Sequence, residues 1–507
     1  MKTKLPFRTA LAWSALSGFL ALAWEIVWTR VFNFASASRA PAFGFMLAGY
    51  LLGLALGSLW SRRWQVLADE AAEPWPRIAR VLLLAHLSAF AVAPLTAMLA
   101  CHVAWQWGYF LVLISGGLLG IAFPLLCHAS IHADDNAGSR LSWIYLANIV
   151  GSGAGSLLTG FVFMEWMGLR PLSLVLLALA WLWTESMALF RLPKGLRAVL
   201  VVVALASLVP FASLYERLQY KTEYNGTMRF PRIVESRHGV ITVDSNKRVY
   251  GNGAYDGLIE TGLEPGSWLV RPYALSAVRD HLENVLVIGV ATGAWTQILA
   301  DHPQVKHITA VELSHGYLEL IASYPEVSGL LHNPKVEIVI DDGRRWLRRH
   351  PDARFDAIVM NTTHHWREFS SALLSKEFLT LVKSRLTPEG IAFWNCTDSG
   401  RAIRTGMEVF PHTLMIINNC VASNAPLQPD RERWARVLSQ YQTEGRPLFD
   451  LTQESGRKAM DGVLDFFKHE GTPVEGDKWK WTNREHMQQK WGSEEVITDD
   501  NLGHEYR

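Results

Sequence analysis

The feature that most constrains this chain is an abrupt change in composition near residue 213. Residues 8–213 consist mostly of long apolar runs, whereas residues 214–507 mix apolar and charged residues. A membrane-spanning helix needs about 20 consecutive apolar residues. The first part holds seven runs of suitable length, at 8–33, 41–61, 79–100, 107–130, 142–164, 171–190 and 196–213. We therefore expect residues 1–213 to form a multi-pass α-helical domain of about seven helices in the lipid bilayer.

Charged and small residues inside the apolar runs predict contacts between these helices. Glu25 and Arg30 lie in the first run, and a charge inside a bilayer is costly unless it is paired or functional. We interpret them as an ion pair that orients helices, with a functional site as the alternative. Gly151 and Gly155 are four residues apart, which is typical of closely packed membrane helices.

Strands and helices alternate in the second part of the chain. Residues 228–262 carry short alternating apolar stretches broken by Gly and Asn, which predicts a small β-hairpin unit. Further strands are predicted at 284–288, 307–312, 336–340, 355–360, 391–396 and 413–419, with helices between them. Such alternation indicates a parallel, doubly wound sheet, whose ligands bind at the carboxyl ends of the strands.

The first two predicted strands end in residues suited to a nucleoside. The stretch VLVIGVATGAW, residues 285–295, places Gly289 and Gly293 in a turn before a helix. Glycines let the backbone approach a ligand closely, and the helix offers its N-terminus. Glu312 ends the second strand, where an acidic residue can bind ribose hydroxyls.

The next two strands end in residues of the same kind. Asp341 and Asp342 follow the third strand, where a carboxylate can accept a hydrogen bond from an adenine amino group. Asn361 follows the fourth strand, at the mouth of the same predicted pocket. A glycine turn and acids at successive strand ends together predict a ligand that contains a nucleoside.

The composition excludes some partners. A formal net charge of +1 gives no indication of a nucleic-acid partner. The four cysteines include no pair with metal-ligand spacing, so we expect no metal site. We expect a small-molecule substrate, and the sequence leaves a homo-oligomer open.

The motifs VLVIGVATG, ITAVEL, VEIVIDDGRRWL and LLSKEFLTLVKSRLTPEGIAFWN resemble spermidine synthases, the polyamine aminopropyltransferases. The apolar part, through EIVWTR, GLALGSLWSRR and YLANIVGSGAGSLLTGF, looks like the multi-pass region fused to some bacterial members. The resemblance implies a bacterial inner-membrane protein with a Rossmann-like, class I methyltransferase-like domain behind a small N-terminal β unit. We accordingly divide the chain into a membrane domain, a β-hairpin unit, a nucleoside-binding domain and a helical tail that packs on it, at 1–213, 214–265, 266–424 and 425–507.

The resemblance also implies ligands and roles. The donor would be decarboxylated S-adenosylmethionine, the product methylthioadenosine, and the acceptor an amine. Gly289 and Gly293 match the donor-binding turn, Glu312 the ribose-binding acid and Asp342 the acid on the adenine side.

Several residues depart from the family pattern. Thr292 stands where the family has an aspartate in the turn, Asn361 replaces the catalytic aspartate, and His364 matches a further acid. The Tyr-His-Glu cluster that lines the family's amine site corresponds to residues 271–273, Arg-Pro-Tyr, and a hairpin glutamine corresponds to Asp256. The residues that we expect at the reaction site are Asn361, Tyr255, Asp256, Tyr273 and His364.

These departures affect the predicted chemistry. A pocket for a polycationic amine needs carboxylates, and asparagine cannot act as a general base. The residues expected to bind the donor are thus kept, whereas those expected to bind the acceptor, the acceptor side, are replaced. The loss of two acids favours intact S-adenosylmethionine, which carries a carboxylate of its own. We expect cleavage or transfer of the donor's aminoalkyl group. Three alternatives stay open: an S-adenosylmethionine lyase without an external acceptor, a methyltransferase, and a non-catalytic sensor or transporter of an adenosyl ligand.

The charge pattern leaves the membrane side of the second part open. Loops rich in Lys and Arg stay cytoplasmic, and such residues gather at the start of the chain, around 62–80, at Arg140 and around 191–197. Seven crossings from a cytoplasmic N-terminus would place the second part outside, whereas the supply of the donor favours the cytoplasm.

Overall fold

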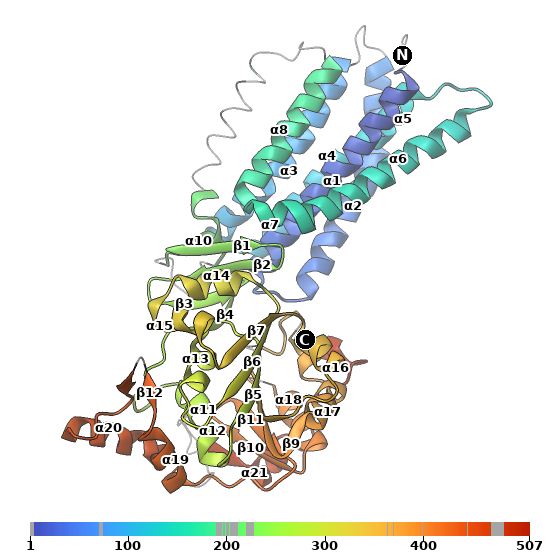
Figure 1. Ribbon diagram of the computed structural model, residues 1–507. Helices are drawn as coiled ribbons and strands as arrows, with labels where there is room; N and C mark the ends of the chain where they lie inside the picture. The colour runs from blue at the N-terminus through green and yellow to red at the C-terminus, as the bar shows by residue number, and fades with distance from the viewer. Residues whose placement is uncertain are drawn as a thin grey trace. The chain divides into compact units, whose positions relative to one another are not determined.

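The computed structural model describes residues 5–69, 75–188, 195, 198, 202, 211–219, 228–361, 364–368, 370–397, 399–443, 445–467 and 481–506. It forms two compact units, Met1–Ser245 and Asn246–Arg507, which we describe one at a time (Figure 1). The division falls inside the segment 214–265, which the sequence assigned to one small unit. The reason is that this segment contains two hairpins, and one belongs to each compact unit.

Long helices make up most of the first unit. They are α1 (Phe7–Ala35), α2 (Pro41–Asp69), α3 (Trp75–His102), α4 (Gly108–Gly120), α5 (Ala122–Ser130), α6 (Ala137–Leu157), α7 (Met164–Trp166), α8 (Leu169–Ala188) and the short α10 (Leu214–Gln219). Five described segments are long and apolar enough to cross a membrane: Phe7–Ala35, Pro41–Val66, Trp75–His102, Trp105–Ser130 and Ala137–Trp166. They coincide with the first five predicted runs. The sixth run is helical as α8, and most of the seventh lies outside the described residues.

Helices α1 and α6 approach each other through glycines. A Cβ added to Gly151 would collide with the carbonyl oxygen of Ala15, and one added to Gly155 would collide with that of Phe19. The prediction of close helix packing at these two glycines is therefore confirmed.

Arg30 does not pair with Glu25, so the predicted ion pair is wrong. Its guanidinium donates to the carbonyl oxygens of Ser236, at 2.7 Å, and Arg237, at 3.1 Å. These carbonyls belong to the turn between β1 (Arg232–Ser236) and β2 (Gly239–Val243). A tight turn leaves carbonyl groups without strand partners, and a buried guanidinium can satisfy them without an opposite charge.

An eight-stranded sheet forms the core of the second unit. Its strand order is β14-β10-β11-β9-β8-β5-β6-β7. The bounds are β5 (Asn284–Ile288), β6 (His307–Glu312), β7 (Val336–Ile340), β8 (Phe355–Met360), β9 (Leu386–Asn395), β10 (His412–Ile416), β11 (Asn419–Ser423) and β14 (Trp481–Asn483). Strands β9, β8, β5, β6 and β7 are parallel, and the other three are antiparallel.

The chain changes direction within this sheet at β5. It passes from β5 through β6 to β7, and returns on the other side of β5 with β8 and β9. This reversal confirms the doubly wound, Rossmann-like fold, and it fixes the edge at which a ligand is expected, outside the carboxyl ends of β5 and its neighbours.

The antiparallel part of the sheet differs from the prediction. The sequence indicated a single strand at 413–419, whereas the structure has the hairpin β10–β11 there. The apolar run hides the reversal, which occurs at Ile417, a residue with the left-handed φ of 58°. The short strand β14, which pairs with β10, was not predicted.

Helices cover both faces of the sheet (Figure 1). They are α11 (Val270–Tyr273), α12 (Leu275–Val278), α13 (Ala294–Ala300), α14 (Gly316–Ala322), α15 (Pro325–Ser328), α16 (Gly343–Arg349), α17 (Lys376–Ser384), α18 (Gly400–Val409), α19 (Arg431–Leu438), α20 (Glu454–Leu464) and α21 (Arg484–Trp491). The helix predicted between the strands at 355–360 and 391–396 begins at Lys376, because the Ser375 side chain caps it by accepting from the Phe378 amide. A second hairpin, β3 (Arg248–Gly251) and β4 (Ala254–Leu258), precedes these elements.

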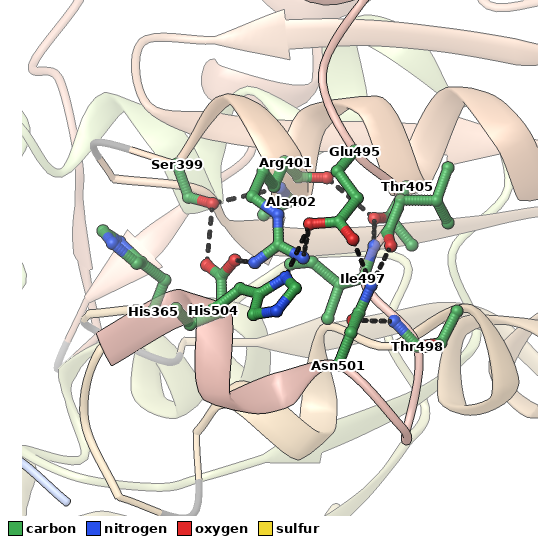
Figure 2. A network of polar contacts seen from close by, with 12 residues as sticks. His365, Ser399, Arg401, Ala402, Thr405, Glu495, Ile497, Thr498, Asn501 and His504 are labelled. Atoms are coloured by element: carbon green, nitrogen blue, oxygen red, sulfur yellow. Dashed lines mark hydrogen bonds and ion pairs between the residues drawn. The ribbon is translucent and has the colours of Figure 1, made fainter. Parts of the chain in front are cut away.

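The C-terminal segment is bound to α18 by polar contacts (Figure 2). Arg401 pairs with the buried carboxylate of Glu505 and, at 2.7 Å, with Glu495. Ser399, the N-cap of α18, donates to Glu505 at 3.1 Å. Between these two glutamates in the chain, Asp499 pairs with Arg344 of α16. The end of the chain is therefore a packed part of the second unit.

Candidate active site

The turn after β5 has a backbone that few side chains tolerate. Gly289 and Gly293 have φ values of 87° and 79°, and Ala291 between them has 49°. The Gly289 amide donates to the Val311 carbonyl at 2.9 Å, which ties the turn to β6. The turn leads directly into α13, so backbone amides gather at the carboxyl end of β5.

Glu312 connects the end of β6 to this turn. Its Oε2 accepts from the amides of Val290, at 2.8 Å, and Ala291, at 3.2 Å, while its Oε1 accepts from Ser314 at 2.9 Å. Burial raises the pKa of the Glu312 carboxyl, and the three amide hydrogen bonds oppose that shift. Oε1 accepts only the Ser314 amide and keeps a second lone pair, so Glu312 can shape the turn and still accept from a ligand hydroxyl.

The two acids after β7 have different surroundings. Asp341 pairs with Arg345 and accepts from the Asp342 amide at 2.7 Å. Burial acts to raise the pKa of Asp341, but the hydrogen bonds from Arg345 and the amide outweigh it and the pKa is lowered. Asp342 caps α16, where its Oδ1 accepts from the Arg345 amide at 2.7 Å. Its Oδ2 accepts no hydrogen bond within the described residues, which leaves Asp342 the better placed to bind a ligand.

Thr292 and Asn361 lie where the family resemblance expects acids. Thr292 is buried, and its hydroxyl accepts from the Ala294 amide at 3.2 Å. Asn361 follows Met360, which pairs with Ile288 at the end of β5, so the turn and Asn361 share one edge of the sheet. Neither side chain carries a negative charge.

His364 lies on the loop that follows β8. Its ring stacks on Trp366, with centroids 4.8 Å apart and planes 12° apart. Residues 362–363, between Asn361 and His364, lie outside the described part of the chain.

Asp256 of β4 is engaged in a buried ion pair. Arg367 and the hydroxyl of Tyr317 both donate to its carboxylate, and Arg367 also donates to the Gly251 carbonyl at 3.0 Å. Burial acts to lower the pKa of Arg367, yet the charge of Asp256 raises it overall. From the sequence we expected Asp256 at the reaction site. In the structure its carboxylate is instead engaged by Arg367 and Tyr317, two partners that the sequence did not indicate.

The two tyrosines predicted for the reaction site differ in exposure. Tyr273 is fully buried, and its hydroxyl donates to the Thr261 carbonyl at 2.6 Å. Tyr255 is 36% exposed and lies edge-on to Tyr250, with ring centroids 5.9 Å apart. The Tyr273 hydroxyl is thus used within the core, whereas Tyr255 stays accessible to a ligand.

An open hollow of about 580 Å³ lies elsewhere in this unit. It is lined by residues that include Gln297, Asp301, Glu326 and Lys335. Asp301 is the C-cap of α13, at the end away from the glycine turn. Since none of the predicted site residues lines this hollow, we place the site at the strand ends instead.

Comparison with known proteins assigns a family model to the central part of the second unit. The family model described as the spermine/spermidine synthase domain matches residues 274–399, which run from before the glycine turn to the end of β9. Residues 274–399 are therefore similar to the spermine/spermidine synthase domain.

The chain is similar to proteins of several bacteria. The polyamine aminopropyltransferase of Mycobacterium tuberculosis is 26% identical over 408 residues, which cover 73% of this chain and 76% of that protein. The one from Oceanobacillus iheyensis is 23% identical over 333 residues, covering 63% and 64% of the two chains. A crystal structure of a spermidine synthase in complex with the transition state analogue AdoDATO is 17% identical, covers 41% of this chain and 86% of its own, and has a TM-score of 0.34.

Proposed function

We propose that this protein is a membrane-anchored enzyme that binds S-adenosylmethionine, or its decarboxylated form, and breaks the bond between the sulfonium sulfur and the aminoalkyl carbon. Methylthioadenosine is the leaving group, and the aminoalkyl group is transferred or released. The relatives named as polyamine aminopropyltransferases support this reaction class. The five apolar helices support the membrane anchor.

The observation that carries the proposal is the link between Glu312 and the glycine turn. A buried carboxylate that accepts from the Val290 and Ala291 amides fixes the turn and faces the edge where β5 and β6 end. Asp342, with one oxygen free of described partners, follows the next strand. Ribose would bind at Glu312 and adenine at Asp342, which places the sulfonium group toward Thr292 and Asn361.

The remade acceptor side supports a reaction that needs no polyamine. Thr292 and Asn361 are uncharged, and the Asp256 carboxylate is neutralised by Arg367 and Tyr317. A polyamine acceptor requires carboxylates to pair its ammonium groups and to accept a proton. In the lyase route, the donor's own carboxylate oxygen attacks its γ-carbon, the carbon–sulfur bond breaks, and the electron pair stays on sulfur. Methylthioadenosine and a lactone are formed without an external base.

The test uses the purified full-length protein in lipid nanodiscs. It is incubated with S-adenosylmethionine or the decarboxylated donor, each with and without diamines, and the nucleoside products are separated by chromatography. We expect methylthioadenosine, at a rate that falls at least 10-fold in Glu312→Gln, since hydrogen bonds to charged groups contribute about 1.5–3 kcal/mol. Glu319→Gln, on the exposed side of α14, is the matched control.

The products discriminate between the reaction classes. Methylthioadenosine without an added amine indicates the lyase, and amine-dependent methylthioadenosine indicates transfer. S-adenosylhomocysteine as the sole product would show a methyltransferase. Binding without any product would show a sensor. Either S-adenosylhomocysteine alone or binding without product would contradict the proposal.

A further inference from the structure

Arg271 lies at the carboxyl edge of the sheet, beside the proposed donor site. It belongs to α11, and its guanidinium packs over the ring of Trp295, 5.1 Å from the centroid. Trp295 is the second residue of α13, directly after the glycine turn. On the other side, Arg271 Nη1 donates to Asn418 Oδ1 at 2.9 Å and to Asn419 Oδ1 at 3.2 Å. Asn419 pairs with Asn395 at the end of β9.

The guanidinium has neutral partners only. Besides the two asparagines, its Nε donates to the Trp268 carbonyl at 2.8 Å, and no carboxylate among the described residues pairs with it. Burial lowers the pKa of Arg271 to about 10. The Nδ2 group of Asn419, fully buried beside it, also has no acceptor within the described chain. A partly buried guanidinium without a carboxylate partner, beside a buried amide group without an acceptor, is costly unless a ligand supplies acceptor oxygens.

We propose that Arg271 binds a carboxylate of the reacting ligand, so that this site takes a ligand of the amino-acid type instead of a polyamine. The proposal rests on the proposed function and specifies its substrate class. A planar guanidinium is suited to a carboxylate because its N–H groups match the two oxygens. The same charge repels a polycation.

Two ligands could bring the carboxylate. One is the donor, since intact S-adenosylmethionine differs from the decarboxylated form by this group. The other is an acceptor amino acid. Arg271 is a substrate-binding residue in either case, and the two sources are separated by matched pairs of ligands that differ only in the carboxylate.

The experiment measures binding to the full-length protein in nanodiscs by calorimetry. The ligands are S-adenosylmethionine, its decarboxylated form, and methylthioadenosine, which lacks the aminoalkyl group. We expect the wild type to prefer S-adenosylmethionine over the decarboxylated donor by about 10- to 100-fold, as for other charge-assisted hydrogen bonds. Arg271→Gln should abolish this preference, and Arg271→Lys should retain part of it. Both should bind methylthioadenosine as the wild type does, which shows that they are folded.

The matched control is Arg279→Gln. Arg279 is a buried arginine at the C-cap of the next helix, α12, and it donates to Ser423 Oγ at 3.1 Å. It should leave the donor preference unchanged. A donor preference that survives in Arg271→Gln would overturn the proposal.

If the wild type binds both donors equally, the second matched pair, ornithine and putrescine, is tested as acceptors. A preference for ornithine that is lost in Arg271→Gln would support the proposal with the acceptor as the source. Equal use of the two acceptors would overturn it. Failure of the wild type to bind methylthioadenosine would instead refute the proposed function, so the two failures are distinct.

Discussion

Arg367 and Asp256, which are 111 residues apart in the chain, form a buried ion pair that joins the loop after β8 to the hairpin β3–β4. Side-chain exposure is 17% for Arg367 and 5% for Asp256. A Cβ at Gly251 would collide with both side chains, so the backbone of β3 approaches them closely. The pair therefore positions a loop that carries His364 and begins next to Asn361.

Removal of one partner should destabilise this unit strongly. Asp256→Asn removes the carboxylate that compensates the largely buried Arg367 charge, for which we expect a loss of about 3–5 kcal/mol in the free energy of unfolding. Urea unfolding followed by tryptophan fluorescence measures it. The control Lys247→Gln breaks the exposed pair with Glu326 and should cost at most about 1 kcal/mol. The double variant Asp256→Asn with Arg367→Met should lose less than the two single variants added together; additive losses would show that the residues act independently.

Donor binding should weaken as the pH falls, because Glu312 must be ionised to accept from both the turn and the ribose. Burial raises the pKa of Glu312 above the ordinary value of 4.5, so the carboxylate is protonated at a higher pH than an exposed glutamate. Affinity for methylthioadenosine should be full above this raised pKa and should fall as the pH drops through it. Calorimetry over a pH series measures the midpoint, and Glu312→Gln should bind weakly without that midpoint. A midpoint at or below 4.5 would contradict this role.

Arg30 should protect the β1–β2 turn from proteolysis. Arg237 in this turn is exposed, and its carbonyl accepts from Arg30, so trypsin cleavage after Arg237 requires the turn to open locally. Arg30→Gln removes the two charge-assisted hydrogen bonds and should speed cleavage about 10-fold. The fragments are identified by mass. The control is Arg8→Gln, an exposed change on the same helix, which should leave the cleavage rate unchanged. An unchanged rate in Arg30→Gln would show that the contact contributes nothing.

The parts of this structure that depend on local pattern could be predicted from the sequence. Strands β5 to β8 begin and end at the predicted residues, because each is a short apolar run bounded by polar or glycine residues. The glycine turn carries its own signal in Gly289 and Gly293. These features made the edge of the sheet predictable.

Contacts between distant segments were not predictable from the same patterns. No spacing in the sequence reveals that Arg367 meets Asp256, or that the Tyr273 hydroxyl bonds to Thr261 inside the core. The partners of a polar side chain are set by how the elements pack. For this reason the sequence placed Glu312, Asp341 and Asp342 correctly at strand ends, but it could not show that the charge of Asp256 is compensated by Arg367.

Restored acids at Thr292 and Asn361 should change the donor that the site prefers. The two residues share the sheet edge toward which the aminoalkyl group is proposed to point. Two carboxylates there would repel the carboxylate of S-adenosylmethionine, because unit charges about 4 Å apart interact by about 4 kcal/mol near a protein surface. In Thr292→Asp with Asn361→Asp, we expect the ratio of affinities to shift at least 10-fold toward the decarboxylated donor. Thr292→Asn is the control, since with the native Asn361 it has the same shape without the charge. If the charged and uncharged variants prefer the same donor, the absence of acids at these positions does not determine donor choice.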